Sequence, residues 1–539
     1  MRLRKVISLA MAVVMVALSF TACDVSLASA CSIAAATGDR TNDGRPVLWK
    51  NRDSWGSSSG NWNGWQVKLY LHNPTGISFG AGDRWGDRFK FTGVTDTQSF
   101  EANLWINDYA AWAGVNEKGL GLVMGSAHNL RNAALQSHGY TPDQDQYGID
   151  GGQLNFFILS RCETIADVEQ FLSDTNNGGG FRGNPNNAAY VSTARNTSCI
   201  IMVCDKNGDT ATFEISDKSF MRDNVNTGSN YVVRDANGYF TFTHTDDKNV
   251  YVPVGSYNGI DYRTNFCRII ENTPARKQTP PFPFFVDTQR QTFNSDGTVT
   301  FYSTPPDGIH DWETTANTVA RWGRVGDRMN HNKDRLDYRI FMQKTVPAST
   351  GIGNGNIETL SRYIGDMSTS NTNYWPNRHV TTFSVVIKGT KSTDVYKGKL
   401  TTMWVALGEP SCSIFVPVFP FANQLPAWSG GNLDDMYTYT NAKRHQVYSY
   451  TTDNATGELS GRNTDRTIDL PTLCGGYYGQ SGIQQNIFAT ENYYFTQHEN
   501  FLAQLRTNMS DDQLRTMLRN WQNATCQAMK NYYVTNTHP

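Results

Sequence analysis

A chain of 539 residues with 39% hydrophobic and 12% aromatic residues has ample material for a folded core, which excludes an intrinsically disordered protein. Its 47 basic and 49 acidic residues nearly cancel, so the charge favours no nucleic-acid partner. Nine cysteines are too few for a disulfide framework in a chain of this size, and the composition instead indicates a globular protein rich in β structure and loops.

Residues 1–30 are typical of an export signal. Basic residues at the start precede an apolar stretch from Val6 to about Phe20, and small residues follow it. No later segment has ~18 uninterrupted apolar residues, the length that a membrane-spanning helix needs. We therefore expect a soluble mature protein that is exported, to the periplasm or outside the cell.

Two processing sites fit this N-terminus. Ala28, Ser29 and Ala30 form an A-x-A site that ends just before Cys31. The segment "SFTAC", which ends at Cys23, instead resembles a lipoprotein signal and would anchor the protein in a membrane. Both alternatives stay open.

The first predicted elements of the mature chain are mainly hairpins. The runs "CSIAAATG" and "PVLWKNRD" flank the turn "DRTNDGR" and predict an opening hairpin. A further strand is predicted in "WAGVNEKGLGLVMGSA", with "NEKG" as its turn. Residues 151–175 predict a helix, within which Thr164 begins a T-x-x-D start. The segment "SCIIMVCDKNGDTATFEIS" then predicts another hairpin around "KNGD".

The second half of the chain is less regular. Residues 275–310 are rich in proline and polar residues and predict an excursion between core elements. Residues 396–420 predict a strand, a turn and a strand. From about residue 425 the composition becomes polar, and the chain closes on a predicted helix in which Ser510 and Gln513 form a capping box. Hairpins, a helix and another hairpin favour an α+β layered domain.

Taken in order, these motifs resemble the N-terminal-nucleophile cysteine hydrolases of linear amides. This superfamily includes penicillin V acylase, choloylglycine (bile salt) hydrolase, the isopenicillin-N acyltransferase group and a related dipeptidase branch. The opening cysteine, the hairpin and "KNRD" at residues 50–53 resemble the family's start, and "AGVNEKGLGLVMGS" resembles its second block. "YRTNF" at 262–266 and "TTANTVARWGR" at 314–324 resemble its later asparagine and arginine blocks. The resemblance covers roughly residues 31–420 and implies the four-layer αββα fold of N-terminal-nucleophile hydrolases.

The resemblance also divides the chain. It implies a catalytic domain at 31–424, which follows the signal peptide at residues 1–30 and precedes a C-terminal extension at 425–539 that is polar and then helical.

A cysteine at the first position of the mature chain could supply both a nucleophile and a base. A thiol is a strong nucleophile once it loses its proton. A free α-amine has a pKa of about 7.7–8, so it can take the thiol proton and later return it to the leaving amine. Cleavage before Cys31 would thus be the activating step. An inert thiol or a half-cystine at Cys31 is the alternative.

The resemblance implies roles for two residues of the "KNRD" motif. Asp53 matches the carboxylate that contacts and orients the nucleophile's amine. Lys50 stands where these hydrolases usually carry an arginine that steadies the thiolate, and lysine keeps the charge but loses the planar fork of donors. Its neighbour Arg52 could substitute for it. A solvated strand end is the alternative interpretation of all three.

Further residues are implied in the later blocks. Asn265 is the implied side-chain donor to the oxyanion, and Arg321 matches the arginine near the nucleophile, with Arg324 as the alternative. Asn116, which opens the "NEKGL" block, and Ser126 are candidates for contacts with the substrate or the oxyanion. An ordinary strand-end serine is the alternative for Ser126.

The sequence predicts no metal and no cofactor. No C-x-x-C motif or Cys/His cluster has zinc-ligand spacing, and "DKNGDT" at 205–210 lacks the twelfth-position Glu of a calcium loop. The expected partner is a small-molecule amide or peptide substrate. Membrane anchoring through Cys23 lipidation and a homo-oligomer stay open.

The expected function is hydrolysis of a linear C–N amide bond through a thioester acyl-enzyme. A dipeptidase or an acyltransferase of the same superfamily is one alternative. A non-catalytic surface lipoprotein that binds glycans or peptides is another.

Overall fold

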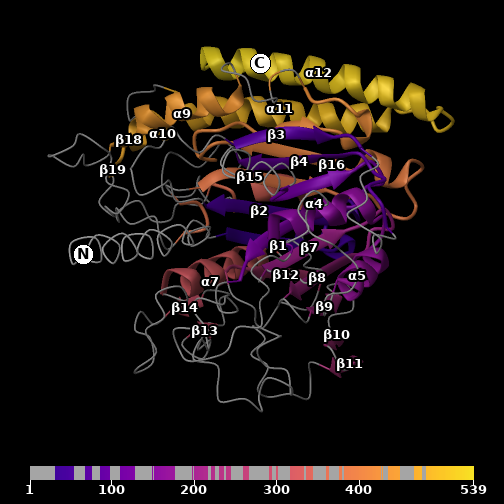
Figure 1. Ribbon diagram of the computed structural model, residues 1–539. Helices are drawn as coiled ribbons and strands as arrows, with labels where there is room; N and C mark the ends of the chain where they lie inside the picture. The colour runs from indigo at the N-terminus through magenta and orange to yellow at the C-terminus, as the bar shows by residue number, and fades with distance from the viewer. Residues whose placement is uncertain are drawn as a thin grey trace, which may run out of the picture.

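The computed structural model shows two large antiparallel sheets and the helices around them (Figure 1). It describes residues 31–53, 67–75, 85–96, 110–127, 149, 151–175, 197, 199–215, 220–224, 230–235, 238–243, 259–265, 291–293, 299–301, 316–332, 336–343, 360–362, 375–378, 381–426, 428, 435–449, 467–475 and 481–539.

The first sheet contains the predicted opening hairpin, which is confirmed. Strand β1 (Cys31–Ala36) pairs antiparallel with β2 (Val47–Asp53), so that Cys31 lies opposite Arg52. Within the described residues the sheet has six strands in the order β12, β1, β2, β15, β16 and β17. The remaining strands are β12 (Ile260–Arg263), β15 (Thr381–Lys388), β16 (Thr402–Leu407) and β17 (Val416–Val418).

The second sheet contains the other two predicted turns. The "NEKG" turn joins β5 (Ala113–Asn116) to β6 (Gly121–Ser126), and the "KNGD" turn joins β7 (Cys199–Cys204) to β8 (Thr210–Ile215). Gly119 and Gly208 close these turns with φ of 91° and 86°, values that favour glycine. In the described residues this sheet runs from β3 to β11 in sequence order, and its other strands are β3 (Val67–His72), β4 (Phe91–Asp96), β9 (Phe220–Asn224), β10 (Asn230–Asp235) and β11 (Gly238–Thr243).

The helix predicted over residues 151–175 is two helices. α4 (Gly151–Arg161) and α5 (Ile165–Asp174) are separated by an extended residue, Thr164, with φ of −132°. The Thr164 hydroxyl accepts from the backbone N–H of Asp167 at 3.2 Å, and the Asp167 carboxylate accepts from the N–H of Thr164 at 3.0 Å. The T-x-x-D motif is therefore a capping box that begins a new helix.

Helices cover the outer faces of both sheets, which confirms the four-layer αββα architecture and the α+β class. α4 and α5 share a buried cluster with the nine-stranded sheet. α7 (Ala316–His331) and α8 (Tyr338–Met342) pack on the outer face of the six-stranded sheet. The inner faces meet in a third cluster, in which Ile33 and Leu48 of one sheet accompany Val123 and Ile200 of the other.

The C-terminal residues 425–539 add helices to this same core. They form α9 (Met436–Val447), α10 (Leu470–Cys474), α11 (Ile483–Ala503) and α12 (Asp511–Thr535). Cys526 and Met529 of α12 lie in the buried cluster that contains β16 and β17. The predicted Ser510–Gln513 capping box begins α12. Figure 1 shows α11 and α12, in yellow, lying side by side along the sheets.

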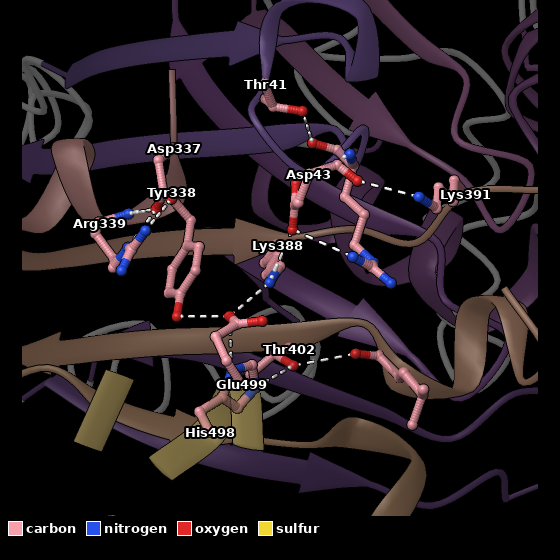
Figure 2. Close-up of polar contacts among 12 residues, drawn as sticks. Thr41, Asp43, Asp337, Tyr338, Arg339, Lys388, Lys391, Thr402, His498 and Glu499 are labelled. Carbon is pink, nitrogen blue, oxygen red and sulfur yellow. Dashed lines mark hydrogen bonds and ion pairs between the residues drawn. The ribbon is translucent and has the colours of Figure 1, made fainter. Parts of the chain in front are cut away.

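A polar network ties the β1–β2 turn to α11 (Figure 2). Lys388 of β15 forms ion pairs with Asp43 of the turn at 2.9 Å and with Glu499 of α11 at 2.7 Å. Glu499 also accepts from the hydroxyl of Tyr338 at 2.9 Å and lies 3.4 Å from Nδ1 of His498. Against the desolvation of burial, the His498 contact and the Lys388 charge hold the pKa of Glu499 below its usual range.

Smaller elements complete the described part of the chain. β13 (Gln291–Phe293) pairs with β14 (Val299–Phe301) inside the segment predicted as an excursion, and β18 (Tyr448–Ser449) pairs with β19 (Thr467–Ile468). Short 3-10 helices are η1 (Gly38–Arg40), η10 (Lys397–Leu400) and η11 (Pro420–Ala422). None of the helices in the described ranges has the length and apolar composition needed to span a bilayer.

The cysteines that the structure describes carry free thiols. Cys204 is fully buried in β7. Cys23 and Cys267 lie outside the described residues.

Candidate active site

Strand β1 places Cys31 on the inner face of the six-stranded sheet. Side chains alternate along a strand, so Cys31 shares a face with Ile33, which lies in the core between the sheets. Across this space lies β6, and a Cβ added to Gly125 would sit 3.8 Å from the Cβ of Cys31. The glycine thus lets the second sheet approach the thiol closely.

Lys50 lies beside the thiol. It is opposite Ile33 in the pairing of β1 with β2, and its Nζ is 3.3 Å from Sγ of Cys31. The same Nζ donates to the backbone carbonyl of Met124. Lys50 is completely buried, and this burial lowers the pKa of its ammonium. A lysine at this position therefore reaches the sulfur even without the fork of an arginine.

Asn265 holds the backbone nitrogen of Cys31. That nitrogen donates to Oδ1 of Asn265 at 2.8 Å, and Nδ2 of Asn265 donates to the carbonyl of Ser126 at 3.0 Å. In the full chain the nitrogen still forms the peptide bond to Ala30. The prediction gave Asn265 a role as oxyanion donor; here one of its two amide N–H groups donates to the carbonyl of Ser126, and its oxygen accepts from the nucleophile's nitrogen. The geometry is that of a group that orients the nitrogen.

Arg321 of α7 lies against the same residue. Its Nη1 donates to the carbonyl of Cys31 at 3.1 Å, and its Nη2 donates to Oδ1 of Asn265 at 3.1 Å. Burial, with a further contribution from the Arg378 charge, lowers the pKa of Arg321 to about 10. The alternative, Arg324, instead stacks on the ring of Trp375 at 3.6 Å. Of the two arginines, the structure brings Arg321 to the nucleophile.

Asp53 lies on the opposite face of β2 from Arg52 and the thiol. Its carboxylate accepts from Nη1 of Arg378 at 3.1 Å and from the hydroxyl of Thr381 at 2.6 Å. It is also 3.9 Å from Nη1 of Arg321. The prediction placed Asp53 in contact with the nucleophile's amine, but this structure connects the two through Arg321. The sequence offered no signal for Arg378 or Thr381, because Arg378 and the start of β15 at Thr381 lie far along the chain from β2.

The two remaining candidates lie at opposite ends of the β5–β6 hairpin. Asn116 ends β5 beside the turn, and Ser126 ends β6 away from the turn. Ser126 lies at the cluster, where its carbonyl binds Asn265. Asn116 does not: its Nδ2 donates to the carbonyls of Leu159 and Cys162, at 2.9 and 2.8 Å. Its Oδ1 accepts from the N–H groups of Lys118, in the "NEKG" turn, and of Leu120, directly after it, at 3.1 and 3.0 Å. Asn116 therefore ties the turn to α4, and the structure separates it from the thiol.

The cluster combines the parts that thiol-based acyl transfer requires. A thiol lies beside a buried cation, and the nitrogen on the same residue faces an amide oxygen. Lys50 and Asp53 come from β2 and Arg321 comes from α7, while Asn265 lies two residues after β12. Within the described residues, no group of three or more His, Cys, Asp and Glu side chains is arranged to hold a metal ion.

No protein-family model matches the sequence, and none of the curated proteins matches it. Among solved structures, the chain is similar to a mutant of conjugated bile acid hydrolase from Clostridium perfringens, at 12% identity and a TM-score of 0.33, over 75% of this chain and 94% of that one. It is similar to penicillin V acylase from Agrobacterium tumefaciens at 11% identity and a TM-score of 0.30, over 72% and 86%. It is also similar to a Caenorhabditis elegans N-acylethanolamine-hydrolyzing acid amidase ortholog, at 10% identity and a TM-score of 0.22, over 48% of this chain and 82% of that one.

The αββα fold is established by the sheets, helices and buried clusters of this chain itself.

Proposed function

We propose that the protein is an exported hydrolase that cleaves linear amide bonds with Cys31 as an N-terminal nucleophile. One observation carries the proposal: the sulfur, nitrogen and carbonyl of this single residue each have a dedicated polar partner, namely Lys50, Asn265 and Arg321. Any buried residue needs partners for its backbone N–H and C=O, but a cysteine that serves only packing does not need a buried lysine beside its sulfur. The position of Cys31 directly after an A-x-A site supports the same reading.

Cleavage of the Ala30–Cys31 bond would activate the site. It would turn the nitrogen held by Asn265 from a peptide N–H into a primary amine. Such an amine can accept a proton near neutral pH, whereas a peptide nitrogen cannot. The contact with Asn265 would keep the amine close to the sulfur of its own residue.

The reaction would proceed in two steps. The amine takes the thiol proton, and the thiolate attacks the amide carbonyl to give a tetrahedral intermediate. Collapse of this intermediate breaks the C–N bond, passes the proton to the leaving amine and leaves a thioester on Cys31. A water molecule, deprotonated by the same amine, then hydrolyses the thioester and regenerates the thiol.

Lys50 would serve both charged species in this sequence. Its ammonium has three N–H donors, of which two are directed at Sγ of Cys31 and the carbonyl of Met124. The third is suited to the oxyanion that develops on the substrate carbonyl. A donor held in a buried site acts more strongly there than in water.

The test is an activity panel with matched serine variants. We expect the mature protein to hydrolyse at least one class among penicillin, bile-salt, acyl-homoserine-lactone and dipeptide amides, and to accumulate an acyl adduct on Cys31 that mass spectrometry detects. Cys31→Ser should abolish both. Cys474→Ser is the control, because burial raises the pKa of that thiol to about 11 and it lies outside the cluster. Full activity in Cys31→Ser would exclude the proposal.

The same panel separates the alternatives. Cleavage of dipeptides alone would favour the dipeptidase branch, and transfer of the acyl group to an added amine would favour an acyltransferase. Binding of glycans or peptides without turnover would favour the non-catalytic lipoprotein.

A further inference from the structure

A surface cleft lies at the turn end of the β5–β6 hairpin, away from Cys31. Its volume is about 290 Å³, at the lower end of the range for small-molecule sites. The "NEKG" and "KNGD" turns, the η10 loop and the start of α12 all contribute to its lining. Strand β6, which spans roughly 17 Å, separates these turns from Ser126 and the cluster around the thiol. The cleft is therefore distinct from the candidate active site.

Cationic side chains outnumber carboxylates in this cleft. The cations are Lys118, Lys206, Lys397, Lys399 and Arg515, and the carboxylates are Glu117, Glu163 and Asp511. The cleft thus has a formal net charge of +2 in a chain whose formal net charge is −2. Charge of one sign gathered in a cleft attracts a ligand of the opposite sign, so an anion is favoured here.

Each carboxylate of the cleft lies beside one of the cations. Asp511 lies 2.6 Å from Nζ of Lys399, Glu163 is paired with Lys206, and Glu117 lies 4.0 Å from Nη2 of Arg515. The carboxylates are thereby neutralised within the cleft, and the positive charge that remains belongs to the other two lysines.

Lys118 and Lys397 carry this remaining charge. Both residues are exposed, and neither side chain forms an ion pair or a hydrogen bond in the described part of the chain. The hydrogen bond from Lys399, and then the charges of Arg515 and Lys118, lower the pKa of Asp511 at the start of α12. Three cations from distant parts of the chain therefore act on one point of the cleft.

Arg515 adds donors that the protein uses only in part. Its Nη1 donates to Asp512 at 3.3 Å, whereas Nη2, at 4.0 Å from Glu117, is beyond hydrogen-bond distance. The ring of Phe421, whose centroid is 4.6 Å from Cζ, supports the guanidinium from one face. The positive end of the α12 dipole lies at the same place, since α12 begins at Asp511. Guanidinium and ammonium donors at the start of a helix are groups by which proteins bind phosphate.

We infer that this cleft binds a small dianion of the phosphate type. The net charge of +2 matches such a dianion, and the volume suits a small ligand. The phosphate would bridge Lys118 of the hairpin turn, Lys397 of the η10 loop and Arg515 of α12, and so join the nine-stranded sheet to the C-terminal helices. Its source is free inorganic phosphate or the phosphoryl group of a larger molecule. The inference does not depend on Cys31 as the nucleophile.

Isothermal titration calorimetry of the mature protein tests the cleft with two probes, inorganic phosphate and phenyl phosphate. Both are mainly dianions at about pH 8, above the second pKa of a phosphate group. Sodium chloride keeps the ionic strength constant, so that binding is not a general effect of salt. We expect one site per chain. Tighter binding of phenyl phosphate would identify the phosphoryl group of a larger molecule as the ligand, and equal or weaker binding would identify free phosphate.

Matched charge variants locate the anion. Lys118→Gln and Lys397→Gln should each weaken binding by roughly 10-fold, the lower end of the range for hydrogen bonds to charged groups. Lys391→Gln is the control, because it makes the same change of charge in the same β15–β16 connection. Nζ of Lys391 donates to the carbonyl of Asp43 at 3.2 Å, and neither residue lines the cleft. Circular dichroism verifies that each variant is folded.

A further variant, Lys50→Met, separates the cleft from the cations of the candidate active site, and it should bind phosphate as the parent does. The inference is refuted if neither probe binds, or if binding is unchanged in both Lys118→Gln and Lys397→Gln. It is also refuted if only Lys50→Met loses binding, because the anion then lies beside Cys31. None of these results bears on hydrolysis by Cys31, which the serine variant tests separately.

Discussion

Replacing Lys50 with methionine removes the cation beside the nucleophile and keeps most of the side-chain volume. Nζ of Lys50 is 3.3 Å from Sγ of Cys31, and the lysine is completely buried. In Lys50→Met the thiolate would lose its nearest positive charge. We therefore expect a smaller fraction of the molecules to carry a reactive thiolate at neutral pH.

The size of the effect follows from two opposing contributions. At 3.3 Å and an effective dielectric constant of about 20, two unit charges attract by about 5 kcal/mol. Burial opposes this attraction, because desolvation is the main cause that lowers the pKa of Lys50. A net loss of about 1.5–3 kcal/mol is expected, as for other hydrogen bonds to charged groups. This corresponds to a rate that is roughly 10- to 100-fold lower.

The assay is the rate of Cys31 alkylation by iodoacetamide as a function of pH. The reagent is neutral, so its rate follows the amount of thiolate rather than the attraction of an anion. In Lys50→Met the rise in rate should move to higher pH. Lys50→Arg is the matched control, because it keeps the charge, and its profile should stay closer to that of the parent.

One result would refute the role that we give to Lys50. If folded Lys50→Met is alkylated as fast as the parent across the whole pH range, the ammonium does not stabilise the thiolate, and the role given to Lys50 is wrong.

Three further predictions concern positioning, pH and stability. Asn265→Ala should lower kcat by roughly 10- to 100-fold, because the nucleophile's nitrogen loses its acceptor, while KM changes little; a change confined to KM would contradict this role. Burial lowers the pKa of His498 below its usual value of about 6.5. As the pH falls below that value, the unfolded chain binds a proton before the folded protein does, so the free energy of unfolding should decrease. Urea unfolding at several pH values measures this decrease, which should be weaker in His498→Asn; an equal decrease in both proteins would refute it. Arg362→Met should lower the free energy of unfolding by about 3–5 kcal/mol, because it leaves the buried carboxylate of Glu491 without its partner at 2.6 Å; a change well under this range in urea unfolding would show that the pair contributes little.

The hairpins could be predicted from the sequence because their signals are local. A turn such as "NEKG" or "KNGD" carries its own glycine, and the strands on either side carry their own apolar runs. The same holds for the capping box at Ser510, which needs only residues three positions apart. Even the break between α4 and α5 was present in the sequence, in Thr164 and Asp167, but the apolar spacing on both sides made the segment look continuous.

The candidate site residues could also be identified from the sequence, but their contacts could not. Asp53 and Asn265 are both polar groups near the nucleophile, and only the distances show that Asn265 binds the Cys31 nitrogen while Asp53 binds Arg378. Those distances depend on strand pairs and a helix brought together from distant parts of the chain. No spacing along the sequence encodes them.

Arg52 shows most clearly the difference between identifying a residue in the sequence and predicting its contacts. In the sequence it is one residue of "KNRD", and its charge suggests only that it could substitute for Lys50. The register of β1 against β2 decides that it lies opposite Cys31, and the packing of the two sheets decides that it stacks on Trp112. A shift of register by one residue would turn its side chain to the other face.

The central claim is that cleavage of the Ala30–Cys31 bond creates the nucleophile's amine. The most direct measurement is N-terminal sequencing, together with the intact mass, of the mature protein purified from an exporting host. The account predicts a mature chain that begins at Cys31, including the case in which a lipidated precursor is trimmed to that residue. An active protein whose chain begins at Cys23, with the Ala30–Cys31 bond intact, would contradict it.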